Sequence, residues 1–226
     1  MAEKKKNVSA PAMEETLNKH EALILKYKNA IIGAIVALVV IVAGVSLYKN
    51  YVSGPAEAKA STALGKAQQL FMEQKYEQAL NGDSTGVAGL LSIASEYSST
   101  DAGNLANLYA GLCYANLEKW QEAAQFIEKF DGTDDQMISP AAMGALGNVY
   151  AHLDQLDKAV STLVKAAEKA DNNSLSPTFL IQAGEILESQ NKKDEALKLY
   201  QTVKDKYFNS MQYQNIDAYI ERATAK

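Results

Sequence analysis

The uncharged run Ala30–Leu47 stands out in the pattern of hydrophobic and polar positions along the chain. As an α-helix, its 18 residues would extend about 27 Å, close to the ~30 Å hydrocarbon core of a bilayer. Tyr27 and Tyr48 flank the run at the depths where aromatic side chains settle in membrane interfaces. The pattern predicts one transmembrane helix over residues 30–48. A cleaved signal peptide is the alternative, although the apolar core of such a peptide is usually only about 7–15 residues long.

Lysine residues are distributed unevenly about the predicted transmembrane helix. Residues 1–29 contain six of them, whereas the 18 residues after the apolar run contain only Lys49 and Lys59. Short lysine-rich segments stay preferentially on the cytoplasmic side of a membrane. We therefore predict that residues 1–29 form a cytoplasmic tail and that residues 49–226 are exported. Five residues of the tail share one helical face at spacings of three and four and predict a short amphipathic helix; they are Met13, Leu17, His20, Ile24 and Tyr27.

Small residues recur along the predicted transmembrane helix. Gly33, Ala37 and Gly44 follow one another at intervals of four and seven, so they share one side of the helix. Such a side lets a second helix approach closely within a membrane. We take these three residues as candidates for intramembrane helix packing.

The exported part contains a repeated pattern of helical hydrophobic positions. An alanine recurs at positions 123, 159 and 196, with a glycine 12 residues before it and large residues nine before and four after it. The residues that we assign to packing within this repeat are Gly111, Tyr114, Trp120, Ala123, Gly147, Tyr150, Ala159, Gly184, Ala196 and Tyr200.

A glycine facing an alanine allows two antiparallel helices to pack closely, and the large residues nearby fill the space beside that contact. A hairpin of this length cannot bury its apolar face alone, so it stacks on the next. The positions are those of the tetratricopeptide repeat (TPR). We expect an all-α TPR solenoid of about three and a half repeats over residues 49–226, with a capping helix over residues 212–223. An irregular first copy is expected, with a long helix over residues 58–80 and Ala88 at its alanine position.

Composition adds little chemistry to this picture. The net charge of −5 lacks the basic footprint of a nucleic-acid-binding protein. Cys113 is the single cysteine and has apolar neighbours, which excludes a disulfide framework and favours a buried, inert thiol. The sequence contains no nucleotide-binding loop, nucleophile elbow or metalloprotease helix. We expect no catalytic residue, no metal, no cofactor and no small-molecule substrate.

The first helices of the repeats line the concave side of such a stack, which we take as the candidate partner-binding groove. Each presents there the residues six and three before, and one and four after, its glycine. The groove is predicted to change from apolar to acidic along the stack; the residues that we single out are Leu105, Leu108, Leu112, Asn148, Ile181, Glu185 and Glu188. Either a partner or the chain's own first helix covers the leucines, since each exposed leucine forgoes about 1.5–3 kcal/mol of burial.

The plan as a whole resembles the YfgM-like ancillary subunits of the bacterial Sec translocon. The likeness rests on the single N-terminal membrane helix, the alanine-rich stretch Ala56-Glu-Ala-Lys-Ala60-Ser, and the repeat positions above. The N-terminal tail, which contains Lys4, Lys5 and Lys6, is longer than the tail expected of the family.

The resemblance implies a non-catalytic scaffold of the bacterial inner membrane with a periplasmic TPR domain. Its implied partners are the translocon channel, a membrane-anchored prolyl-isomerase-type chaperone and exported polypeptides. The alternative is a cell-envelope or division-site adaptor that bridges the inner membrane to wall or outer-membrane complexes.

Overall fold

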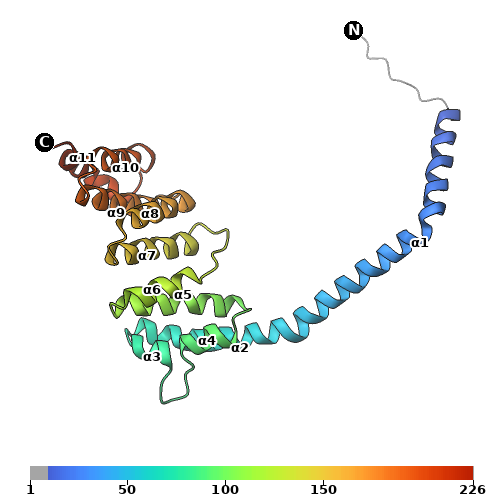
Figure 1. Cartoon of the computed structure of the whole chain (residues 1–226), viewed down its shortest axis with the longest axis horizontal. Helices are drawn as coiled ribbons and strands as arrows, with labels where there is room; N and C mark the ends of the chain where they lie inside the picture. The colour runs from blue at the N-terminus through green and yellow to red at the C-terminus, as the bar shows by residue number, and fades with distance from the viewer. Residues whose placement is uncertain (1–9, 226) are drawn as a thin grey trace, which may run out of the picture. The chain divides into compact units, whose positions relative to one another are not determined.

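The computed structural model describes the backbone of residues 10–225 and the side chains of residues 26–225. Contacts divide the chain into two compact units, Met1–Pro55 and Ala56–Lys226 (Figure 1). The boundary between these units falls a few residues later than the one predicted after residue 48. The predicted amphipathic face from Met13 to Ile24 and the lysines Lys4, Lys5 and Lys6 lie outside the described side chains.

The N-terminal unit is built on α1, a helix of 39 residues from Ala10 to Tyr48. It runs without a break through the segment predicted as a short amphipathic helix and the segment predicted to cross a membrane. A five-residue π-helix, Lys49–Ser53, then leads into α2 (Gly54–Met72). Within the described residues, the helical segment Lys26–Met72 is the one that is long and apolar enough to cross a membrane. A membrane anchor and a signal sequence both have this character.

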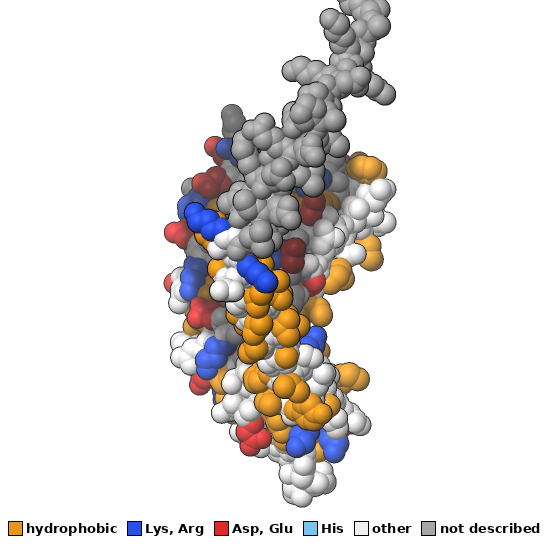
Figure 2. Space-filling model, turned by 90° about the vertical axis from the view of Figure 1, so that its right-hand side faces the viewer, with side chains coloured by type: hydrophobic (Ala, Val, Ile, Leu, Met, Phe, Trp, Pro, Cys, Tyr) orange, Lys and Arg blue, Asp and Glu red, His pale blue; other side chains and the backbone are white. Residues whose placement is uncertain are grey.

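The apolar side chains of α1 are open to their surroundings. They include Ile31, Val36 and Ile41, and none is buried within the unit. Figure 2 shows hydrophobic side chains over the near face of the described part of this helix. In water each such side chain would forgo the free energy of burial, so the helix is suited to an apolar surrounding.

Three regular helical hairpins in the second unit follow the predicted repeat; they are α5/α6 (Asp101–Asn116 and Trp120–Glu128), α7/α8 (Ile138–His152 and Leu156–Ala170) and α9/α10 (Ser176–Ser189 and Lys193–Lys206). Each hairpin packs on the next, and α11 (Ile216–Thr224) packs on α10 after a 3-10 helix, Met211–Asn215. The predicted all-α class, with helical repeats and a C-terminal capping helix, is confirmed.

The first helix of each hairpin ends in the same left-handed turn. Glu118, Asp154 and Asn191 each stand five residues before the repeat alanine, and each has a φ of 58–61°. The next N–H then reaches back five residues, as from Lys119 to the Tyr114 carbonyl at 2.9 Å. This is the Schellman arrangement, which satisfies carbonyls left over at a helix end. It reverses the chain into the second helix.

The same turn corrects the predicted register of the first repeat. Gln74 has a φ of 60°, which breaks the long helix predicted over residues 58–80 and places the repeat alanine at Ala79. The prediction of Ala88 was wrong, because that residue lies outside the helices and forms an isolated bridge with Gly82. The second helix of this repeat is split into α3 (Tyr76–Asn81) and α4 (Leu90–Glu96) by residues 82–89. The described chain therefore contains four hairpins.

Close helix contacts occur at the repeat glycines. A Cβ atom added to Gly111 would lie 2.4 Å from Ile127 Cγ1 and 3.0 Å from the Ala123 carbonyl oxygen. A Cβ atom added to Gly147 would lie 2.7 Å from a side-chain carbon of Leu163. One added to Gly184 would lie 2.4 Å from a ring carbon of Tyr200. Each glycine thus faces the large residue four positions after the repeat alanine. The three predicted repeat alanines are fully buried; they are Ala123, Ala159 and Ala196.

The first helix of the unit, α2, packs beside α5. The Glu57 carboxylate accepts hydrogen bonds from the N–H groups of Asp101 and Ala102 at 2.7 and 3.1 Å. Further along, the rings of Phe71 and Tyr109 meet edge to face, with centroids 5.4 Å apart. These contacts place α2 in the position of the first helix of a repeat.

Candidate functional site

Two hollows lie on the surface formed by the first helices of successive hairpins, and we call this surface the groove. The apolar hollow, of about 410 Å³, lies between α5 and α7; its lining residues are Leu108, Leu112, Met137, Ile138, Ala141 and Ala142. The polar hollow, of about 450 Å³, lies between α7 and α9; its lining residues are Asn148, Ala151, His152, Gln182, Glu185 and Ile186. Both hollows share α7.

The apolar hollow has a buried floor and an exposed rim. Leu108 at the floor is 6% exposed, whereas Met137 and Ile138 at the rim are 54% and 51% exposed. Every lining residue belongs to α5, to α7 or to the position just before α7, so α2 does not fill this space. Large apolar side chains beside an open apolar hollow are typical of a surface that a protein partner covers.

The rim of the apolar hollow is fixed by the start of α7. The Asp135 carboxylate accepts hydrogen bonds from the N–H groups of Met137 and Ile138 at 2.8 and 2.5 Å. It also accepts one from the Ser139 hydroxyl, and that bond is the largest cause of a pKa held well below the usual range of an aspartate. The rim therefore lies at a helix start whose first N–H groups are capped by Asp135.

The polar hollow contains hydrogen-bond acceptors that are weakly engaged. Gln182 Oε1 is buried and has no hydrogen-bond partner within the described residues. Glu185 is about half exposed, and its carboxylate makes one long ion pair, 3.8 Å from Arg222 Nη2. His152 closes one side and stacks on Trp120, with ring centroids 3.8 Å apart and planes 1° from parallel.

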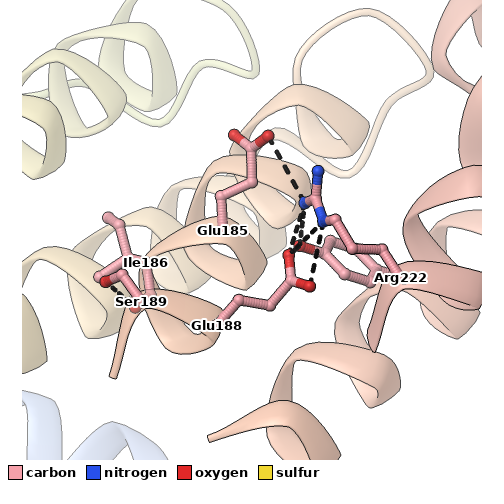
Figure 3. Close-up of polar contacts among 6 residues, drawn as sticks. Glu185, Ile186, Glu188, Ser189 and Arg222 are labelled. Carbon is pink, nitrogen blue, oxygen red and sulfur yellow. Dashed lines mark hydrogen bonds and ion pairs between the residues drawn. The ribbon is translucent and has the colours of Figure 1, made fainter. Parts of the chain in front are cut away.

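On α9, Glu188 is held by a residue of the capping helix. The Arg222 Nε and Nη2 atoms bind the Glu188 carboxylate at 3.1 and 2.5 Å, and the Tyr200 hydroxyl donates to it at 2.8 Å (Figure 3). The Arg222 bond is the largest cause of a lowered Glu188 pKa. Only 13% of the Glu188 side chain is exposed. A bidentate pair of this kind is among the stronger polar contacts in proteins.

The structure distributes the predicted groove residues over several environments. Leu108 and Leu112 line the apolar hollow, and Asn148 and Glu185 line the polar hollow. The other three predicted groove residues are engaged inside the domain: Leu105 packs against the core of the first repeat, Ile181 lies in the C-terminal core, and Glu188 is bound by Arg222. Contacts with neighbouring helices take these three out of the groove: the first-repeat core for Leu105, and the C-terminal helices for Ile181 and Glu188.

Sequence reasoning missed the residues that form the rim. Met137 and Ile138 lie where a largely polar connection meets the start of α7, outside the repeat positions that define the groove. Two adjacent large apolar residues in a polar connection are the signal that could have identified them. Gln182 and His152 were also missed, because they stand one position away from the expected groove positions.

The remaining candidates lie away from the groove. Gly33, Ala37 and Gly44 are on α1, and a Cβ added to either glycine would meet no atom within 4 Å. Cys113 is fully buried in the first-repeat core, as predicted, and burial raises the pKa of its thiol to about 12. A thiol in this state is a poor nucleophile.

Comparison with known proteins identifies the repeat. The family described as tetratricopeptide repeat-like domain matches residues 24–220, a range that includes most of the apolar helix and all four hairpins. A comparison with curated proteins gives no significant match. Domains of this kind are typically non-catalytic and bind other proteins. The chain belongs to the tetratricopeptide repeat-like domain family.

Proposed function

We propose that this chain is a non-catalytic interaction subunit of a bacterial inner membrane, which assists exported polypeptides beside the translocon. In this proposal α1 anchors the chain, residues 1–29 remain in the cytoplasm, and residues 49–226 form a periplasmic domain. The observation that carries the proposal is the open apolar hollow of Leu108, Leu112, Met137 and Ile138 in a domain joined to a long apolar helix.

Two further observations support this orientation and anchoring. Lysines are concentrated before the apolar segment, as the positive-inside rule requires of a cytoplasmic tail. After it, the exposed rings of Tyr48 and Tyr51 lie where the chain would leave the hydrocarbon. Tyrosine is enriched at that depth because its ring is apolar and its hydroxyl is polar.

The proposed partners follow from the resemblance to YfgM-like subunits. They are the translocon channel, a membrane-anchored prolyl-isomerase-type chaperone and polypeptides emerging into the periplasm. Such polypeptides expose apolar segments before they fold, and the apolar hollow supplies a surface for them. The groove needs no cofactor for this role.

Photo-crosslinking in intact membranes tests the proposal. A crosslinking amino acid at Met137 stands at the exposed rim, and one at Glu168, an exposed residue of α8, is the matched control. We expect Met137 to capture translocon subunits, the chaperone or exported chains, and Glu168 to capture far less. Capture of wall or outer-membrane proteins alone would favour the envelope adaptor instead. Equal capture at both positions would contradict a role for the groove.

A further inference from the structure

We propose that the groove binds an extended polypeptide segment with adjacent apolar side chains and, about four residues away, one lysine or arginine. The apolar side chains would enter the apolar hollow and the cation the polar hollow. This inference rests on the proposed function and specifies the chemistry of its partner.

The apolar hollow selects carbon-rich side chains. The side chains that line it are all aliphatic; they are Leu108, Leu112, Met137, Ile138, Ala141 and Ala142. A charged or amide group placed there would lose its water without gaining a hydrogen-bond partner from these side chains. A leucine, isoleucine or methionine would instead cover the exposed rim and gain burial itself.

The polar hollow selects a hydrogen-bond donor with positive charge. Glu185 contributes a half-exposed carboxylate to this hollow. Gln182 lines the same hollow, and its Oε1 is buried and has no partner among the described residues. Among the side chains that line this hollow, none belongs to lysine or arginine. An accessible carboxylate with only one long ion pair, in a hollow lined by no basic side chain, favours an ammonium or guanidinium group.

The same face of α9 already binds a guanidinium from within the chain. Figure 3 shows Arg222 extending between Glu185 and Glu188, which lie three residues apart on α9. Its guanidinium nitrogens bind the Glu188 carboxylate at 2.5–3.1 Å, whereas Nη2 lies 3.8 Å from the Glu185 carboxylate. Glu185 therefore retains the capacity to bind a second cation on the side of the polar hollow.

The spacing of the two hollows sets the spacing within the ligand. Ala141 and Asn148 are seven residues apart on α7, or about 10 Å along its axis. The two hollows are also displaced from each other across the stack by about one interhelix distance, about 8–10 Å. Together these give about 14 Å, which an extended chain covers in about four residues.

Peptide binding to the full-length protein in lipid nanodiscs tests this inference. The probes are labelled peptides with a Leu-Ile-Leu block and an arginine, separated by spacers of one, four or eight Gly/Ser residues, in both chain directions. Matched peptides carry glutamine in place of arginine. We expect the spacer of four to bind most tightly in one direction, by fluorescence anisotropy against empty nanodiscs.

Substitutions then assign each hollow. Glu185→Gln is expected to weaken binding of the arginine peptide about five- to tenfold and binding of the glutamine peptide less than twofold. Glu168→Gln, on the exposed face of α8, is the charge-matched control and is expected to change neither. Met137→Ser with Ile138→Ser is expected to weaken both peptides, and both positions are half exposed, so the fold is retained.

Three results would overturn the inference: equal effects of Glu185→Gln on the two peptides, binding that is independent of spacer length, or no binding at all. If Met137 still captures exported chains in membranes under any of these results, the proposed function stands and only the ligand chemistry falls. If the peptides behave as expected but membranes yield no exported chain, translocon subunit or chaperone, the groove chemistry stands and the proposed function falls.

Discussion

At each hairpin turn, one residue with a positive φ determines where the first helix ends. Glutamine, glutamate, aspartate and asparagine occupy this position, and none has the conformational freedom of glycine. A residue with a Cβ atom pays roughly 1–2 kcal/mol to adopt the left-handed conformation. The turns at Gln74 and Glu118 therefore retain strain that the packing of the hairpins offsets, whereas the aspartate and asparagine at the other two turns adopt this conformation more readily.

Glu118→Gly is expected to stabilise the second unit by about 0.5–1 kcal/mol, because glycine adopts a φ of 59° without steric cost. The gain is smaller than the strain, since glycine also raises the entropy of the unfolded chain. Urea unfolding of the full chain in micelles measures it. Glu122→Gly, inside α6, is the control and should destabilise by about 1 kcal/mol.

Gly111→Ala is expected to cost more stability than Gly147→Ala. The new methyl group at Gly111 would approach the Ala123 carbonyl oxygen and the Ile127 nitrogen at 3.0 and 2.9 Å, and backbone atoms move only with their helix. At Gly147 the nearest atoms belong to the flexible side chain of Leu163. We expect about 1–3 kcal/mol at Gly111 and less at Gly147. Equal unfolding midpoints in urea would contradict this packing.

Among the elements, α7 is the one whose start bears most directly on the groove. Its cap at Asp135 holds the backbone of Met137 and Ile138, the rim of the apolar hollow. Leu108→Glu looks from the sequence like a test of an open groove. The structure makes Ile138→Glu the better test, because Leu108 is part of the core whereas Ile138 is half exposed.

Asp135→Ala is expected to destabilise the protein by about 0.5–2 kcal/mol at neutral pH, the usual cost of a lost helix cap. The pKa of Asp135 is lowered in the folded state, so its contribution is present above the unfolded pKa of about 4 and is lost as the pH falls further. The difference between variant and parent should therefore shrink below pH 4. Its exposed neighbour Asp134, changed to alanine, provides the control for thermal unfolding at pH 7 and pH 3.

The capping helix α11 depends on Arg222. Arg222→Ala is expected to cost about 1.5–3 kcal/mol, because it leaves the mostly buried Glu188 carboxylate without its cation. Adding Glu188→Gln should recover part of that loss, as a double-mutant cycle would measure. The lowered Glu188 pKa predicts that the Arg222 contribution fades as the pH falls below about 4. A loss that persists unchanged in acid would rule out this ion pair as its source.

The elements were predictable wherever the repeat spacing is regular. Spacings of 36 and 37 residues located three hairpins, because glycine, alanine and the large residues occupy fixed positions in a close helix contact. The correct register of the first repeat was not recognised, because residues 82–89 lengthen the spacing between its alanine, Ala79, and Ala123 to 44 residues. Tyr76-Glu-Gln-Ala79 resembles Trp120-Gln-Glu-Ala123 and could have revealed it. Three groove residues, Leu105, Ile181 and Glu188, could not be placed, because only the tertiary fold shows which helices cover them.

For the whole molecule, the central prediction is that α1 remains in the membrane. Val39→Arg places a charge in the middle of the apolar segment and should impair insertion, at a cost of about 2.5–3.5 kcal/mol. Val39→Leu is the control. The parent protein should stay with membranes in high salt and alkaline carbonate, as fractionation and blotting would detect. A soluble fragment that begins near Ser46 would identify a signal peptide instead.

The split second helix of the first repeat has a mechanical consequence. In a stack of hairpins, each unit contacts only its neighbours, so a pulling force is borne by one interface after another. Tension applied through α1 enters the domain at α2, whose own hairpin partner is the six-residue α3. With α4 separated by an eight-residue loop, this repeat has the shortest continuous second helix and should open first under load. The three hairpins beyond it, and with them the groove, would be shielded from movements of the anchor.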